Sequence, residues 1–111
     1  MTYQIPNYLE HISTNKFYSG MHWTKRRSIS DAWHNAIILL CKQKKIATVK
    51  KRCIIIFGFN NKFDCDNNSV MVKMIVDGLV KAKVLKGDSK KYVVGITVYI
   101  SDSNYLDIQE I

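Results

Sequence analysis

The pattern of apolar and polar positions divides the chain into two long helices and four strands. Apolar residues recur at spacings of three and four over about 24–45 and again over about 69–82, which is helical spacing. Residues 53–59 are β-branched and aromatic on both faces, which is typical of a central strand. Further strands are predicted over 92–100, over 105–111 as a more exposed last strand, and over 3–8 as an edge strand. The segment 14–23 is expected to be a loop.

The resulting order, β-α-β-α-β-β, predicts an α+β fold in which two helices pack on one sheet. A chain of 111 residues forms a single domain, 1–111, and is short enough that dimerisation would help to cover its apolar surface. No apolar run approaches the length of a membrane span and no secretory leader is recognisable, so no membrane partner is expected. Cys41 and Cys53 are expected to be inert core residues, and the odd number of cysteines favours a cytoplasmic location.

The charge balance points to an acidic partner. The chain has 17 Lys and Arg against 9 Asp and Glu, a net charge of +8, which favours nucleic acid. A basic cluster opens the first long helix, where it opposes the helix dipole and so suggests an external anion. Many small basic proteins are simply soluble, however, so charge alone is weak support. The candidate DNA-binding residues are Lys16, Lys25, Arg26 and Arg27, and His22 beside them has either a structural or a DNA-contacting role.

Three aspartates in this basic chain are candidates for a metal site. Asp64 and Asp66 follow the central strand, and in an extended segment their side chains would point the same way, with Cys65 facing away. Asp88 follows one helix later. Carboxylate oxygens are the ligands that Mg²⁺ prefers, so these residues predict metal-assisted chemistry on phosphate.

The second long helix is apolar almost all round, apart from a polar stripe formed by Lys73, Asp77 and Lys81. These residues have the spacing of ordinary i,i+4 ion pairs on a solvated helix face, each worth a few tenths of a kcal/mol. A helix that is apolar elsewhere must be buried on most sides, which favours the alternative that its polar stripe faces a site.

The acidic residues also form a family pattern. They read Asp64-x-Asp66-Asn67, then Lys73, Asp77-Gly78-Leu79, and finally Asp88-Ser89-Lys90-Lys91-Tyr92-Val93, preceded by a weaker match at Asn15-Lys16 and His22-Trp23-x-Lys25-Arg26. In this pattern the chain resembles the RusA-type Holliday-junction resolvases, small phage and bacterial endodeoxyribonucleases. Gly87 stands where many members carry a second aspartate, and the spacing from Asn67 to Lys73 is three residues longer than in the shortest members.

The resemblance implies a Mg²⁺-dependent endonuclease that nicks branched DNA in pairs during recombination and repair. Asp64, Asp66 and Asp88 would hold Mg²⁺ and Lys73 would be the catalytic lysine, with Asn67 and Asp77 in supporting roles. A four-way junction is nearly two-fold symmetric, so a homodimer in the cytoplasm of a bacterium or phage-infected host is expected. No small-molecule cofactor is expected. The alternative is a basic nucleic-acid-binding module whose acidic site is degenerate.

Overall fold

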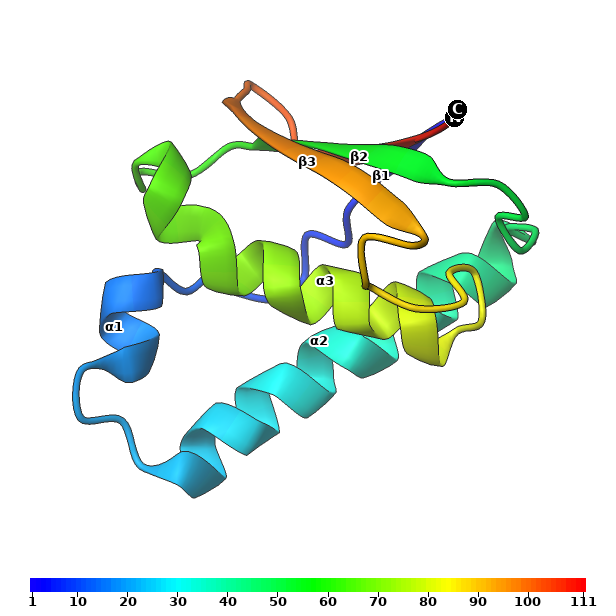
Figure 1. Ribbon diagram of the computed structural model, residues 1–111. Coiled ribbons are helices and arrows are strands. Elements are labelled where there is room, and N and C mark those ends of the chain that lie inside the picture. The colour runs from blue at the N-terminus through cyan, green and yellow to red at the C-terminus, as the bar shows by residue number, and fades with distance from the viewer.

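A four-stranded sheet and two long helices form the layers of the fold (Figure 1), which the computed structural model describes over all residues 1–111. The helix α3 lies between the sheet and α2, and the short helix α1 lies beside the start of α3. In chain order the elements are β1 (Thr2–Gln4), α1 (Thr14–Tyr18), α2 (Trp23–Gln43), β2 (Cys53–Phe59), the 3₁₀ helix η1 (Cys65–Asn68), α3 (Ser69–Lys81), β3 (Val93–Ile100) and β4 (Tyr105–Glu110).

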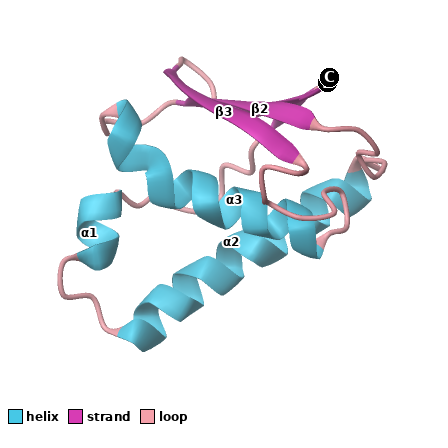
Figure 2. Ribbon diagram, viewed as in Figure 1, coloured by secondary structure: helices cyan, strands magenta, loops and turns pink.

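The predicted α+β class is confirmed, as are the two long helices and the four strands (Figure 2). The strand order is β1-β4-β2-β3, so β2 is central and β1 is an edge, both as predicted. Strand β3 runs parallel to β2, and α3 makes the crossover between them. The prediction for β4 was wrong: it lies between β1 and β2 and pairs antiparallel with both, and it buries Leu106 and Ile108.

Two local predictions were also wrong. The expected loop over 14–23 contains α1, because the Ser13 side chain accepts a hydrogen bond from the backbone N–H of Lys16 (3.2 Å) and Phe17 is buried beneath the turn. The segment carrying Asp66 is not extended but forms η1, so alternation of its side chains cannot be assumed.

The core lies between the sheet and the helices. Alternate residues of β2, from Cys53 to Phe59, are fully buried, and α3 buries eight of its thirteen residues because it is covered on both sides. Cys41 and Cys53 are buried, as predicted, and burial raises the pKa of each thiol. None of the helices combines the length and apolarity needed to cross a membrane.

Candidate functional site

The turn that carries Asp64 and Asp66 is fixed from inside by two asparagine side chains. Asn68 is fully buried, and its amide exchanges hydrogen bonds with the amide of Asn61 (2.8 and 3.3 Å). Asn68 also donates to the backbone carbonyl of Asp64 (3.4 Å). A buried amide is stable only when it is hydrogen-bonded, so this pair fixes the path of the chain from the end of β2 into η1.

Asn67 ties the same turn to α1. Its side-chain oxygen accepts a hydrogen bond from the backbone N–H of Asn15 (3.0 Å), and its carbonyl accepts one from the hydroxyl of Thr14 (3.2 Å). Asn67 was expected to hold the loop by a hydrogen bond between its side chain and the backbone, and it forms such a bond. Sequence reasoning missed Asn61 and Asn68, because nothing in their spacing distinguishes a buried asparagine from an exposed one.

Asp64 and Asp66 have exposed carboxylates that form no hydrogen bond or ion pair with another side chain. Asp66 lines an open groove of about 440 Å³ between the start of α3 and strand β3. Cys65 lines the same groove as Asp66. The expectation that Cys65 faces away from the aspartates is therefore wrong. In a chain with this excess of basic residues, the unpaired carboxylates of Asp64 and Asp66 are available to a cation, and that of Asp66 lies at the groove.

Lys73 lies between two other aspartates, Asp77 and Asp88. Its ammonium donates to Asp77 (3.1 Å) on the next turn of α3 and to Asp88 (3.0 Å) in the loop before β3. Hydrogen bonding by Asp88 and then by Asp77 raises the pKa of Lys73, and the same contact with Lys73 lowers the pKa of Asp88. The side chains of Lys73, Asp77 and Asp88 are 60%, 32% and 50% exposed, so solvent weakens these pairs.

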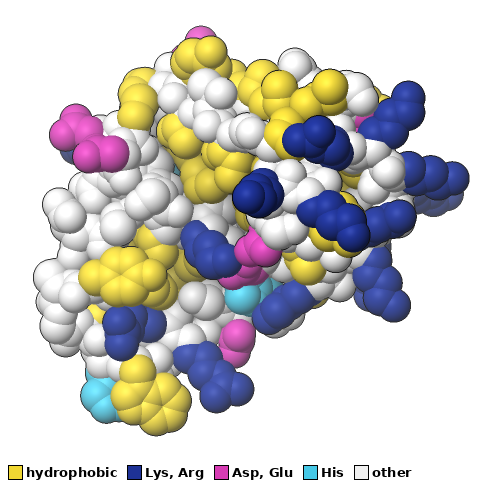
Figure 3. Space-filling view, viewed as in Figure 1, with side chains coloured by type: hydrophobic (Ala, Val, Ile, Leu, Met, Phe, Trp, Pro, Cys, Tyr) yellow, Lys and Arg dark blue, Asp and Glu magenta, His cyan; other side chains and the backbone are white.

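The polar stripe of α3 meets a histidine of α2 that sequence reasoning had not selected. Lys81 donates to Nδ1 of His34 (2.9 Å), so the neutral ring carries its proton on Nε2, which lies 4.0 Å from Asp77. That Nε2 is buried and has no hydrogen-bond partner. Burial first, and the charge of Lys81 second, lower the pKa of His34. In Figure 3, acidic and histidine side chains meet basic ones in the middle of this face.

Of the four candidate DNA-binding residues, Lys25, Arg26 and Arg27 lie in the first turns of α2 and Lys16 lies on α1. Arg26 stacks over Tyr18 (5.9 Å to the ring centre) and Arg27 lies 4.0 Å from Asp31, whereas Lys16 and Lys25 form no ion pair. His22 caps α2 by accepting a hydrogen bond from the backbone N–H of Thr24 (3.2 Å), which gives it a structural role.

The three aspartates suit a divalent cation in the kind of atom they offer, but the fold does not bring them together. No group of three or more His, Cys, Asp or Glu side chains lies close enough to hold one ion. Asp88 is instead bound to Lys73, while Asp64 and Asp66 lie at η1, before the start of α3. The residues therefore form a pair of free carboxylates and a separate lysine-centred network.

Compared with known protein families and with curated proteins, the chain matches no family model and no individual protein.

Proposed function

We propose that this chain is a Mg²⁺-dependent endodeoxyribonuclease that nicks branched DNA, with a four-way junction as its preferred substrate. The observation that carries the proposal is the position of Lys73, a solvated cation held by Asp77 and Asp88 on the polar stripe of a buried helix. Charged networks that perturb pKa values, as this one does for Lys73 and Asp88, cluster at functional sites. The resemblance of the aspartate motif to junction resolvases supports the same assignment.

In this proposal Lys73 stabilises negative charge on the phosphate under attack. Its two carboxylate partners keep it protonated and fix the direction of its ammonium, and a preoriented charge stabilises a developing charge better than a mobile one. Asp64 and Asp66 would hold Mg²⁺, which when bound supplies a Lewis acid for the phosphate and lowers the pKa of a bound water. Asp88 acts through Lys73, because that is the group it contacts.

DNA would be held through phosphates by the basic side chains at the start of α2 and on α1. Lys16 and Lys25 lack any acidic partner in the protein, so their full charge is available to the substrate. Contacts of this kind position the duplex without reading its sequence. Specificity for branch points would then come from DNA shape, as expected of a structure-selective enzyme.

The free edge of β3 supports the proposed homodimer. This strand is at the end of the sheet, contains no charged residue, and exposes Ile96, Tyr99 and Ile100 by 46%, 54% and 56%. Soluble proteins normally protect such an edge with charges, proline or a bulge, because its unpaired N–H and C=O groups can pair with another strand. The pairing of β3 with β2 is irregular at Val94, but from Gly95 to Ile100 the strand is regular and uncharged. Lys90 and Lys91 precede the strand and Asp102 follows it, so antiparallel pairing of two copies brings opposite charges together.

A second candidate function is a nucleic-acid-binding module without catalysis. It is favoured by the engagement of Asp88 with Lys73, because a carboxylate that neutralises a lysine can serve structure alone. Both candidates require the basic surface, but only the enzyme requires Asp64 and Asp66.

Cleavage of an end-labelled four-way junction, with Mg²⁺ and then with EDTA, separates the two. The enzyme gives paired nicks that EDTA abolishes. The control variant is Glu110→Gln. Glu110 is exposed, forms no ion pair and lies at the opposite end of the sheet from Asp64, so this variant should cut the junction normally. Binding of the junction without nicks at any Mg²⁺ concentration would establish the binding module instead.

A further inference from the structure

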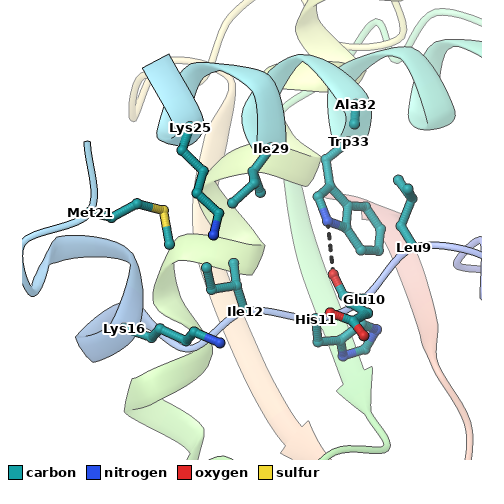
Figure 4. A pocket seen from close by; sticks show the side chains of 10 residues that line it. All are labelled: Leu9, Glu10, His11, Ile12, Lys16, Met21, Lys25, Ile29, Ala32 and Trp33. Atoms are coloured by element: carbon teal, nitrogen blue, oxygen red, sulfur yellow. Dashed lines mark hydrogen bonds between the residues drawn. The ribbon is translucent and has the colours of Figure 1, made fainter. Parts of the chain in front are cut away.

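A hollow of about 220 Å³ lies between the N-terminal segment 9–12, α1 and the first turns of α2 (Figure 4). Of five main hollows on the molecule it is the smallest and the most enclosed, and neither the aspartates nor Lys73 line it. Six of its ten lining residues are apolar: Leu9, Ile12, Met21, Ile29, Ala32 and Trp33. An apolar hollow with a few polar groups at its rim is the usual form of a site for a small organic group.

The charges around this hollow favour an anion. Lys16 and Lys25 line it from α1 and α2, and their ammonium groups lie on either side of Ile12 (Figure 4). Neither lysine has an ion-pair partner, and the single acidic side chain in the wall, Glu10, forms no ion pair either. Two lysines against one glutamate leave the lining with an excess of positive charge, which attracts an anion.

One wall of the hollow, formed by Trp33 and His11, is held in place by contacts within the protein. Trp33 is 1% exposed, and its indole N–H donates to the backbone carbonyl of Glu10 (3.3 Å). His11 packs edge-on against Trp33, with 5.7 Å between the ring centres. A preformed site binds without the cost of ordering its own side chains.

The hollow is also connected to the turn that carries the aspartates. Nδ1 of His11 accepts a hydrogen bond from the amide of Asn61 (2.8 Å), the same amide group that is bonded to the buried Asn68. Asn68 in turn donates to the backbone carbonyl of Asp64. One continuous chain of hydrogen bonds therefore runs from the wall of the hollow to the proposed nuclease site.

From these contacts we propose that the hollow binds a single unpaired nucleotide of a DNA strand, an inference that rests on the proposed action on branched DNA. Lys16 and Lys25 hold its phosphate, and the base lies against the apolar wall of Leu9, Met21 and Ile29. A paired base cannot enter, because its edge and both faces are occupied in the duplex. Nucleotides at a branch point are unstacked at least cost, so the hollow selects branched or single-stranded DNA over duplex.

Trp33 reports on the occupant without any need for cleavage. Fluorescence is measured in EDTA on the Trp23→Phe variant, which removes the other indole, a side chain that is 59% exposed and lies outside the core. The probes are a short single-stranded oligothymidylate, a blunt duplex of equal length and thymidine monophosphate. We expect the single strand to shift the Trp33 emission and the duplex to leave it unchanged even where the duplex binds.

Charge variants then locate the phosphate. Lys16→Gln and Lys25→Gln should each weaken the single-strand affinity about tenfold at low salt, the loss expected for one charged hydrogen bond. Glu10→Gln should strengthen it. The matched control is Lys42→Gln, which removes an exposed and unpaired lysine from the last turn of the same helix and should leave the emission change intact.

Three results would overturn the proposal: an equal emission change with duplex, a loss of affinity in Lys42→Gln as large as in Lys25→Gln, or equally tight binding of thymidine monophosphate, which would assign the hollow to a free nucleotide. Failure of the proposed function looks different. A chain that never cuts a junction but passes the fluorescence test still binds an unpaired nucleotide, whereas a chain that cuts junctions without a Trp33 response has no such site.

Discussion

Gly78 of α3 lies directly against Ile37 of α2. A β-carbon on residue 78 would come within 2.8 Å of the β-carbon of Ile37, a distance that real side chains do not adopt. The two helices therefore touch at this point because residue 78 has no side chain. The neighbouring Asp77 reaches His34, one turn before Ile37, through the same close approach.

Gly78→Ala should therefore destabilise the protein even though alanine favours helices. The β-carbon of Ile37 is attached to backbone and cannot rotate away, so α2 and α3 must separate, at a cost of about 1–3 kcal/mol for overpacking. Urea unfolding measures the change. Gly95→Ala is the matched control, since a β-carbon there meets Ile54 at an ordinary 3.7 Å. Equal stability of the two variants would contradict the close packing of the helices.

Asn68→Ala should also lower the free energy of unfolding, by about 1–3 kcal/mol, because it leaves the amide of Asn61 without its buried partner. The exposed Asn35 of α2 makes no side-chain hydrogen bond, so Asn35→Ala serves as the control and should be nearly neutral. Amide hydrogen exchange in η1 should rise in the Asn68 variant. Unchanged protection there would mean that the asparagine pair does not hold the turn.

The sequence predicted the elements whose cause is local. Strand β2 is a run of β-branched and aromatic residues and was predicted over its observed range, Cys53–Phe59. The polar stripe of α3 was predicted from helical spacing, and Lys73 and Asp77 do pair along it. The short α1 was missed because five residues with one buried side chain, Phe17, carry almost no periodicity.

What the sequence could not predict depends on contacts between distant segments. Strand β4 alternates like an exposed strand because only one sheet face is covered by helices, yet it lies inside the sheet. His34 joins Asp77 and Lys81 only through the packing of α2 on α3. An extended segment was expected at Asp66. The chain instead forms the 3₁₀ helix η1 there, which buries the side chain of Asn68.

The proposed nuclease makes a direct prediction for its aspartates. Asp64→Asn and Asp66→Asn should each abolish junction cleavage by removing a ligand of the proposed Mg²⁺, and Asp88→Asn should abolish it by releasing Lys73. Each change also removes a negative charge near phosphate, so gel-shift affinity for the junction should stay the same or increase. Normal cleavage by any one variant would exclude that residue from the site, and loss of folding in all three would indicate a structural role.

Binding of DNA should be strongly salt-dependent and almost independent of sequence. Lys25→Glu or Arg26→Glu should weaken binding evenly across junctions of different sequence and lower the slope of log K against log salt by about one unit for each phosphate that the variant no longer neutralises. The control is Lys42→Glu, which makes the same charge change in the last turn of α2 and should leave the slope unchanged. A slope that does not change in the Lys25 and Arg26 variants would place the DNA surface elsewhere.

The last prediction concerns assembly. Two nicks across a nearly symmetric junction require two sites, and the uncharged free edge of β3 offers a self-complementary surface on which two copies can pair. Sedimentation at micromolar concentration should therefore detect a dimer. Ile96→Lys places a charge in the middle of this edge and should give a monomer, whereas Thr2→Lys on β1, at the opposite edge of the sheet, should remain dimeric. A wild-type monomer that still makes paired, coordinated nicks would refute the dimer, and a monomer that nicks only once would indicate a flap or single-branch nuclease.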